Sequence, residues 1–134
     1  MPATAQQQRV IEAEDLLRFE LVFDPQISPS GRHAVFGVKK VGSQNNYQTQ
    51  LHVTDLEGGT SRPFTCGEKD HSPRWSPDGQ QIAFVGTRSE QQPQIYLIPA
   101  QGGEARALTR FPEGSIGKFC WSPQGQYLAV AFRI

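Results

Sequence analysis

Residues 74–85 read Arg-Trp-Ser-Pro-Asp-Gly-Gln-Gln-Ile-Ala-Phe-Val, and this stretch decides the fold. Pro77 has the backbone angle φ that the second position of a type I turn requires, and Asp78 suits the third position. Gly79 can adopt the left-handed conformation that closes a hairpin. The stretch therefore predicts a strand that ends near Trp75, a tight turn, and a second strand that contains the apolar residues 82–85.

The same pattern returns along the chain, which indicates an internal repeat. Ser-Pro-x-Gly begins at Ser28, Ser76 and Ser122, which are 48 and 46 residues apart (76 − 28 and 122 − 76). The later part of the unit repeats as well, because Gln-Leu-His-Val at 50–53 matches Gln-Ile-Tyr-Leu at 94–97. Each unit holds four strand candidates, and four short strands in about 40–50 residues are the signature of a β-propeller blade.

We therefore expect an all-β fold, an incomplete β-propeller of about two four-stranded blades plus half a third, with a short amino-terminal helix. A propeller has about four to eight blades, so the chain reads as a piece of a larger protein. A small β-sandwich also has short, regularly spaced strands and is the alternative. Residues 1–24 are expected to form a mobile tail, up to about residue 9, and an amphipathic helix at about 11–18. The predicted propeller, 25–134, divides into units 25–66, 71–111 and 117–134.

Large apolar residues recur at one place in the repeat. Trp75 and Trp121 precede their Ser-Pro pairs, and Ile27 holds that place in the first unit. We expect all three in the core between blades; a tryptophan box for a ligand is the alternative. The apolar runs 82–85 and 128–132 do not alternate with polar residues, which predicts strands that are buried on both faces.

A dense apolar patch, residues 19–23, lies between the predicted helix and the first strand. A patch of this size needs a cover, which is either the first sheet of this chain or another domain. The predicted last strand, residues 127–134, is also apolar, with one charge and no proline. Its outer edge has no following strand, so we expect the chain to self-associate through this open edge.

Composition excludes several function classes. The 134 residues include 13 basic and 13 acidic side chains without a basic patch, so a nucleic-acid partner is not expected. No run approaches the roughly 20 apolar residues of a membrane span. Residues 1–8 lack the charged start and apolar core of a signal peptide, which favours a cytoplasmic location.

We interpret Cys66 and Cys120 as thiols packed like small apolar groups; a bridge or redox pair is the alternative.

The residues that carry hydrolytic or metal chemistry do not form a site in this sequence. A hydrolase nucleophile elbow reads Gly-x-Ser-x-Gly, and the nearest stretch, 59–63, lacks the second glycine around Ser61. His33, His52 and His71 do not have a metal-ligand spacing. We therefore predict that the chain contains no catalytic, cofactor-binding or metal-binding residue and needs no cofactor.

The repeat and the leading segment together resemble a known family. Trp-Ser-Pro-Asp-Gly-x-x-Ile-Ala-Phe at 75–84, followed by Gln-Ile-Tyr and Gly-Gly, resembles the repeat shared by periplasmic Tol-system propellers and the prolyl oligopeptidase family. Residues 14–31 resemble the amino-terminal opening of acylaminoacyl-peptidase-like members of the prolyl oligopeptidase family. The likeness extends from about Glu12 to the last residue. The first unit departs from it at Ile27 and Ser30, and the third at Gln124.

The resemblance implies a serine peptidase in which a leading helix precedes a propeller and an α/β-hydrolase domain follows. In that family the propeller covers the active site and limits access to short peptides, while the catalytic residues belong to the hydrolase domain, which this chain lacks. We therefore expect the chain to be inactive alone and to meet peptide substrate and hydrolase domain within the parent enzyme. The alternative function is a protein-binding module, as part of a non-catalytic Tol-like propeller.

Overall fold

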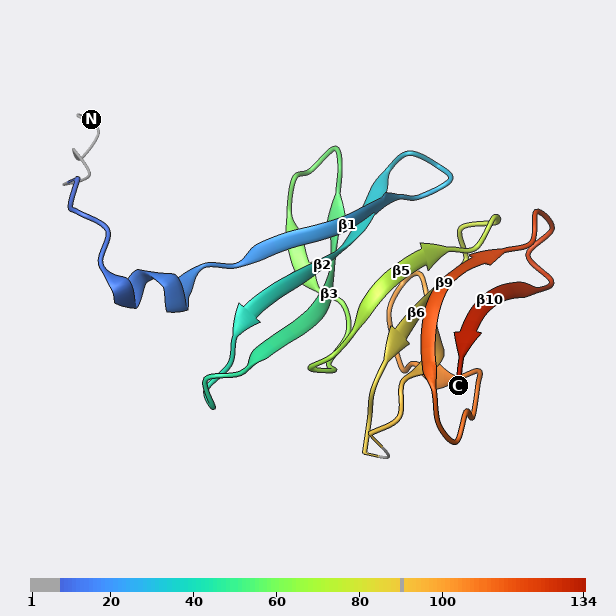
Figure 1. The fold of residues 1–134 in the computed structure, drawn as a ribbon. Coiled ribbons are helices and arrows are strands. Elements are labelled where there is room, and N and C mark those ends of the chain that lie inside the picture. The colour runs from blue at the N-terminus through green and yellow to red at the C-terminus, as the bar shows by residue number, and fades with distance from the viewer. Residues whose placement is uncertain (1–7, 90) are drawn as a thin grey trace.

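The computed structural model describes residues 8–89 and 91–134, so the predicted mobility of the first seven residues lies outside the described part. The protein is nearly all β, with 48% of residues in strands and 5% in helix, and the sheets do not close into a ring (Figure 1). The predicted fold class is confirmed. The described elements are η1 (Ala13–Arg18), β1 (Leu21–Ile27), β2 (His33–Val41), β3 (Tyr47–Asp55), β4 (Ser61–Pro63), β5 (His71–Trp75), β6 (Gln81–Gly86), β7 (Gln94–Pro99), β8 (Arg106–Ala107), β9 (Ser115–Trp121) and β10 (Leu128–Arg133).

The strands form three antiparallel sheets that follow chain order. The first sheet is β1-β2-β3-β4, the second is β5-β6-β7-β8, and the third contains β9 and β10. We call these sheets blades 1, 2 and 3. Figure 1 shows the first strands of the blades, β1, β5 and β9, side by side, and contacts join β1 to β5. The first strands are therefore the inner strands, on which the blades converge.

The three Ser-Pro turns have one geometry, as the sequence predicts. In each turn the glycine N–H donates to the serine carbonyl oxygen over 2.9 Å. Gly31, Gly79 and Gly125 have φ between 71° and 74°, in the left-handed region that a residue with a side chain rarely adopts. The serine side chain adds a further bond, because Ser76 Oγ accepts a hydrogen bond from the N–H of Gln81 at 3.0 Å.

This geometry predicts that Gly79→Val destabilises the protein far more than Gln80→Val. Valine at position 79 is strained at a φ of 71°, which costs about 1–3 kcal/mol, whereas Gln80 is exposed and directly precedes β6. Urea unfolding followed by tryptophan fluorescence measures both variants. Equal midpoints for the two variants would contradict the turn geometry.

Each inner strand contains a β-bulge, which the sequence reading did not predict. Between Phe23 and Gln26, two residues of β1 lie opposite a single residue of β2. The same arrangement occurs between His71 and Arg74 of β5, opposite β6. The pairing of β9 with β10 shifts in the corresponding place. Asp24 has a positive φ of 49° and lies in the bulge of β1 beside Pro25. β1 also begins at Leu21, before the predicted start of the first unit at residue 25.

Two apolar clusters form the core, one on each side of blade 2. The cluster toward blade 1 includes Leu51, Ile82 and Phe84, all with no exposed surface. The cluster toward blade 3 includes Ile95 and Phe119. The run 82–85 is buried throughout, as predicted. The run 128–132 is not, because only one face of β10 packs against blade 2.

Three predicted core residues are more exposed than expected. Ile27 is 66% exposed, so its predicted burial between blades is wrong. It lies on the side of blade 1 that faces away from blade 2, where the described residues provide no neighbouring sheet. Trp75 and Trp121 are half-buried, and each packs against an apolar cluster without being enclosed by it.

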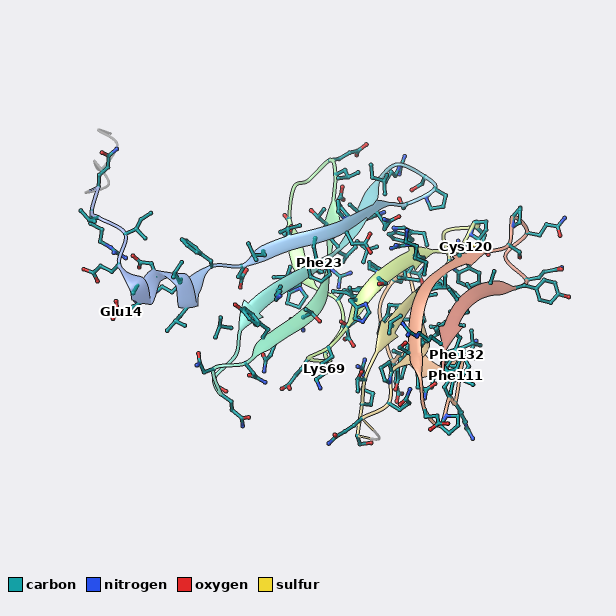
Figure 2. The ribbon with its side chains drawn as sticks, viewed as in Figure 1. Glu14, Phe23, Lys69, Phe111, Cys120 and Phe132 are labelled. Atoms are coloured by element: carbon teal, nitrogen blue, oxygen red, sulfur yellow. The ribbon has the colours of Figure 1, made fainter. Side chains whose placement is uncertain are left out.

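The leading segment forms a short 3₁₀ helix, η1, with no buried residue. Two hydrogen bonds support its start, because the N–H of Glu12 donates to Asp15 Oδ2 over 2.9 Å and the N–H of Asp15 donates to the carbonyl oxygen of Glu12 over 3.0 Å. In the patch 19–23 only Phe23 is partly covered, and its ring lies over Gly37 of β2 (Figure 2). Phe19, Leu21 and Val22 remain exposed, so the first sheet covers only part of the patch.

Candidate functional site

Two features of the fold are candidates for function, and the first is the seam where the inner strands meet. The Trp75 indole N–H donates to the carbonyl oxygen of Gln26 at 3.0 Å, and Trp121 repeats this bond to the carbonyl of Arg74 at 3.1 Å. Each bond joins a blade to the one before it. The Ser-Pro turns of successive blades also stack. A Cβ added to Gly79 would lie 3.6 Å from Pro29, and one added to Gly125 would lie 3.4 Å from Pro77.

Charged side chains from different blades meet on this seam. Arg74 Nη1 of β5 lies 2.8 Å from Asp24 Oδ2 in the bulge of β1, and both side chains are about one-third exposed. Lys118, in the bulge of β9, is exposed. In a propeller the inner strands surround a central channel, so these residues are placed on the surface that a molecule inside the channel meets.

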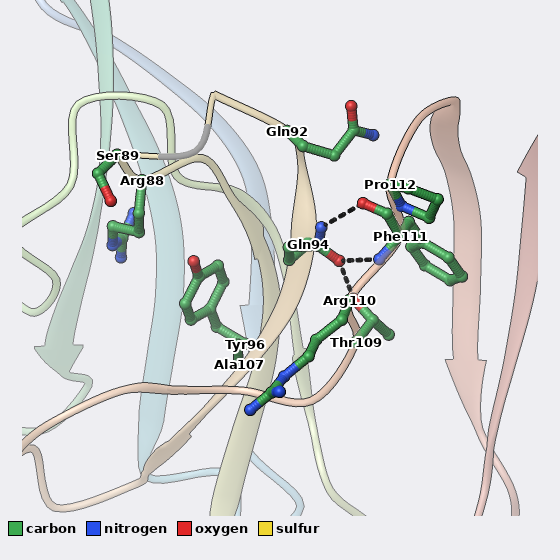
Figure 3. A pocket seen from close by; sticks show the side chains of 10 residues that line it. All are labelled: Arg88, Ser89, Gln92, Gln94, Tyr96, Ala107, Thr109, Arg110, Phe111 and Pro112. Carbon is green, nitrogen blue, oxygen red and sulfur yellow. Dashed lines mark hydrogen bonds between the residues drawn. The ribbon is translucent and has the colours of Figure 1, made fainter.

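The second feature is a hollow of about 520 Å³ beside β7, which we call the β7 hollow (Figure 3). Its size lies within the range of small-molecule pockets, about 300–1,000 Å³. Strand β7, the end of β8, the segment that follows β8 and the loop after β6 provide its walls. It is lined by Arg88, Ser89, Gln92, Gln94, Tyr96, Ala107, Thr109, Arg110, Phe111 and Pro112.

A buried glutamine holds one wall of the β7 hollow in place. Gln94 is 6% exposed, and its Oε1 accepts hydrogen bonds from Thr109 Oγ1 at 2.6 Å and from the N–H of Phe111 at 2.9 Å. Its Nε2 donates to the carbonyl of Phe111 at 2.9 Å, and Figure 3 shows all three bonds. The Phe111 ring stacks on Phe132 of β10 at 4.2 Å. Three hydrogen bonds within the fold therefore fix the orientation of the Gln94 amide.

An ion pair fixes the opposite wall. Asp70 has no exposed surface, and its Oδ1 lies 2.6 Å from Arg88 Nη1. The Arg88 guanidinium also lies over the Tyr96 ring at 4.8 Å. Burial alone lowers the pKa of Arg88, but the hydrogen bond and charge of Asp70 outweigh burial and raise it. The pair also ties blade 1 to blade 2, because the N–H of Asp70 donates to the carbonyl of Thr49 in β3.

The three histidines do not come together in one site. His33 and His52 lie on adjacent strands but pair with different residues, Asp55 and Phe36, which places them about three residues, or 10 Å, apart along the ladder. His71 begins β5 in the next blade, where its Nδ1 lies 2.9 Å from Ser72 Oγ. Within the described residues, no group of three His, Cys, Asp or Glu side chains has the arrangement of a metal site.

Burial lowers the pKa of His71, and the charges of Asp70 and Asp24 oppose this only in part. A histidine with a lowered folded pKa contributes its full stability above its unfolded pKa, near 6.5, and loses it as the pH falls toward the folded value. We therefore expect the free energy of unfolding to decrease from about pH 7 to pH 5 and His71→Gln to flatten this slope. Urea unfolding at several pH values measures this pH dependence. If the slope in His71→Gln equals that of the natural chain, His71 is not its source.

The remaining candidate residues of the sequence are surface positions. Ser61 is exposed in the short strand β4, where it pairs with Thr54, and this strand position is not a nucleophile elbow. Cys66 and Cys120 are both exposed, so the prediction that they pack as small apolar groups is wrong. Cys120 is exposed because side chains alternate along β9: its neighbour Phe119 packs toward blade 2, so Cys120 lies on the opposite side of the strand. No described helix has the length and apolar character that crossing a membrane requires.

Sequence reasoning missed Asp70, Arg88 and the residues of the β7 hollow. A signal was present in the repeat: Gln94 and Thr109 match Gln50 and Thr65 at an offset of 44, but Arg110 corresponds to Cys66. The match therefore ends at Thr109, and the architecture of the blade does not require an arginine at the next position.

Comparisons with known proteins match almost the entire chain. The model of the TolB beta propeller domain family, PD40, matches residues 4–133. Among curated relatives, the uncharacterized peptidase YuxL of Bacillus subtilis is 37% identical over 124 residues, which are 91% of this chain and 19% of YuxL. The Tol-Pal system protein TolB of Alcanivorax borkumensis is 35% identical over 82 residues, which are 60% of this chain and 19% of that protein. The chain thus spans about one fifth of the length of these relatives.

Solved structures show the same fold. The acylaminoacyl peptidase of Pyrococcus horikoshii has a TM-score of 0.72 and 22% identity, over 86% of this chain and 18% of that protein. The predicted resemblance to the propeller part of acylaminoacyl-peptidase-like proteins is therefore confirmed. With its repeated Ser-Pro turns, its four-stranded blades and the match over residues 4–133, the chain belongs to the TolB beta propeller domain family.

Proposed function

We propose that this chain is part of the propeller of a serine peptidase of the prolyl oligopeptidase family, and that this propeller limits access to a separate hydrolase domain to short peptides. The main support is the relative that is named a peptidase and matches 91% of the chain, whereas the TolB relative matches 60%. The seam of inner strands supports the proposal as well, because the indole hydrogen bonds and the stacked Ser-Pro turns join each blade to the one before it, as a propeller that limits access requires.

The exposed leading segment supports a hydrolase domain as the partner in the parent protein. Leu16 and Leu17 of η1 are more than half exposed, as are Phe19, Leu21 and Val22 that follow. Figure 2 shows η1 beyond the end of the first sheet, at the left of the view. Contiguous exposed apolar residues mark a surface that another domain covers.

The protein encoded by the complete gene tests the proposed function. We expect its sequence to contain Gly-x-Ser-x-Gly, and a fluorophosphonate probe to label that serine with one probe per chain. The 134-residue chain alone is the matched control and is expected to stay unlabelled. A complete protein without this motif and without labelling would favour the second candidate.

The second candidate is a protein-binding module in a non-catalytic propeller. The observation in its favour is the TolB of Alcanivorax borkumensis, at 35% identity. In that case the complete protein ends after further blades, and its function is to bind a protein partner rather than to cleave peptides.

We also propose that the isolated chain self-associates through β10. Among the described strands β10 pairs only with β9, so its outer edge carries free backbone N–H and C=O groups. Light scattering at micromolar concentrations measures this association. We expect the mean mass to rise with concentration, and a monomer at all concentrations would show that the chain protects its own edge.

A further inference from the structure

We propose that the β7 hollow binds a small oxyanion, a carboxylate or phosphate group, with Arg110 and Tyr96 as its main contacts. Its lining contains two arginines, a tyrosine and a serine, whereas none of the lining residues is acidic. Arginine, tyrosine and serine side chains donate hydrogen bonds, and arginine adds a positive charge. The chemistry of the lining is therefore that of an anion site.

The two arginines of the hollow differ in whether an acidic side chain already neutralises their positive charge. Arg88 is paired with the buried Asp70, so it brings hydrogen-bond donors but little net charge. Arg110 is exposed and forms no salt bridge with a described residue. Figure 3 shows Tyr96 between Arg88 on one side and Arg110 on the other. The positive charge available to a ligand is consequently that of Arg110.

The walls of the hollow are fixed before any ligand arrives. Gln94 holds the backbone of Phe111, and Gln92 Nε2 donates to the carbonyl of Gly114 at 2.8 Å, so the loop that carries Arg110 is tied at two points. Asp70 holds Arg88 on the other side. A preorganised site loses less conformational entropy when it binds, and this raises its affinity for a small ligand.

The first unit provides an internal comparison. The threonine contact of the blade is present in both units, because Leu51 N–H donates to Thr65 Oγ1 at 3.1 Å and Ile95 N–H to Thr109 Oγ1 at 2.9 Å. In contrast, Arg110 replaces the Cys66 of the first unit. The fold therefore explains the threonine in this wall but does not require the arginine that follows it.

Equilibrium dialysis of the 134-residue chain tests the proposal with two radiolabelled probes, inorganic phosphate and succinate. The method reports probe bound per chain, whatever the association state of the protein. We expect saturable binding of at least one probe at millimolar concentration, and the better probe identifies phosphate or carboxylate as the ligand group. Arg110→Gln should weaken binding about tenfold, because a charge-assisted hydrogen bond is lost.

Arg106→Gln is the matched control, since Arg106 is exposed on β8, makes the same charge change and does not line the hollow. It should leave affinity within about twofold, whereas Tyr96→Phe should weaken it through loss of the hydroxyl alone. Circular dichroism checks that each variant keeps its strand content. Absence of saturable binding of both probes overturns the proposal, and so does an equal loss in Arg106→Gln and Arg110→Gln.

Discussion

Phe84→Ala is expected to lower the free energy of unfolding by about 3–5 kcal/mol, because it empties a fully buried site between blades 1 and 2. The ring of Phe84 stacks on Tyr96 with centroids 5.7 Å apart and belongs to the cluster that includes Leu51 of blade 1. The substitution removes the apolar contacts and leaves a cavity that close-packed neighbours fill only in part.

Phe36→Ala is the matched control for Phe84→Ala, since Phe36 holds the corresponding place in blade 1, 48 residues earlier (84 − 36). Phe36 is half-buried, and its ring lies 6.0 Å from His52 on the side of blade 1 that faces away from blade 2. Its replacement should cost clearly less. Urea unfolding at concentrations below the onset of association compares the two variants, and equal losses contradict the placement of blade 2 between two apolar clusters.

Asp70→Ala is expected to destabilise the protein by about 3 kcal/mol, the lower end of the range for breaking a buried ion pair. The carboxylate has no exposed surface, and it accepts the N–H of Gly67 at 3.0 Å in addition to binding Arg88. Arg88 is 29% exposed, so it can reach solvent once the carboxylate is gone, which keeps the loss from being larger.

Two further variants separate the ion pair from a general charge effect. Glu68→Ala removes an exposed carboxylate from the same loop and should change stability by no more than about 0.5 kcal/mol. In a double-mutant cycle with Arg88→Met, we expect a coupling energy within about 0.5–3 kcal/mol. Additive losses from Asp70→Ala and Arg88→Met would show that the two side chains do not act together.

The sequence predicted the repeat and the turns because these depend on local chemistry. Proline fixes its φ and glycine tolerates a positive φ wherever they occur, so the three Ser-Pro turns share one geometry. The run 82–85 was also predicted correctly, since a continuous apolar run indicates a strand with neighbours on both faces.

The features that sequence reasoning missed depend on contacts between distant residues. Asp70 and Arg88 are 18 positions apart, and only the path of the loop beside β3 brings them together. The bulges shift the pairing register of the inner strands, and the amino-acid composition of these strands does not reveal such a shift. Ile27 and Cys120 looked like core residues because apolar character does not reveal which side of a blade lacks a neighbour.

Peptide cleavage by the protein of the complete gene tests most directly whether the propeller limits access to short peptides. The measurement compares kcat/KM for a short peptide and a long peptide that share one cleavage site, in the natural protein and in Trp121→Phe. That variant keeps an aromatic ring but loses the five-membered ring of the indole, and with it the N–H that joins β9 to the carbonyl of Arg74. We predict a strong preference for the short peptide in the natural protein and a weaker one in Trp121→Phe. Equal cleavage of both peptides by the natural protein would contradict the proposed role of this propeller.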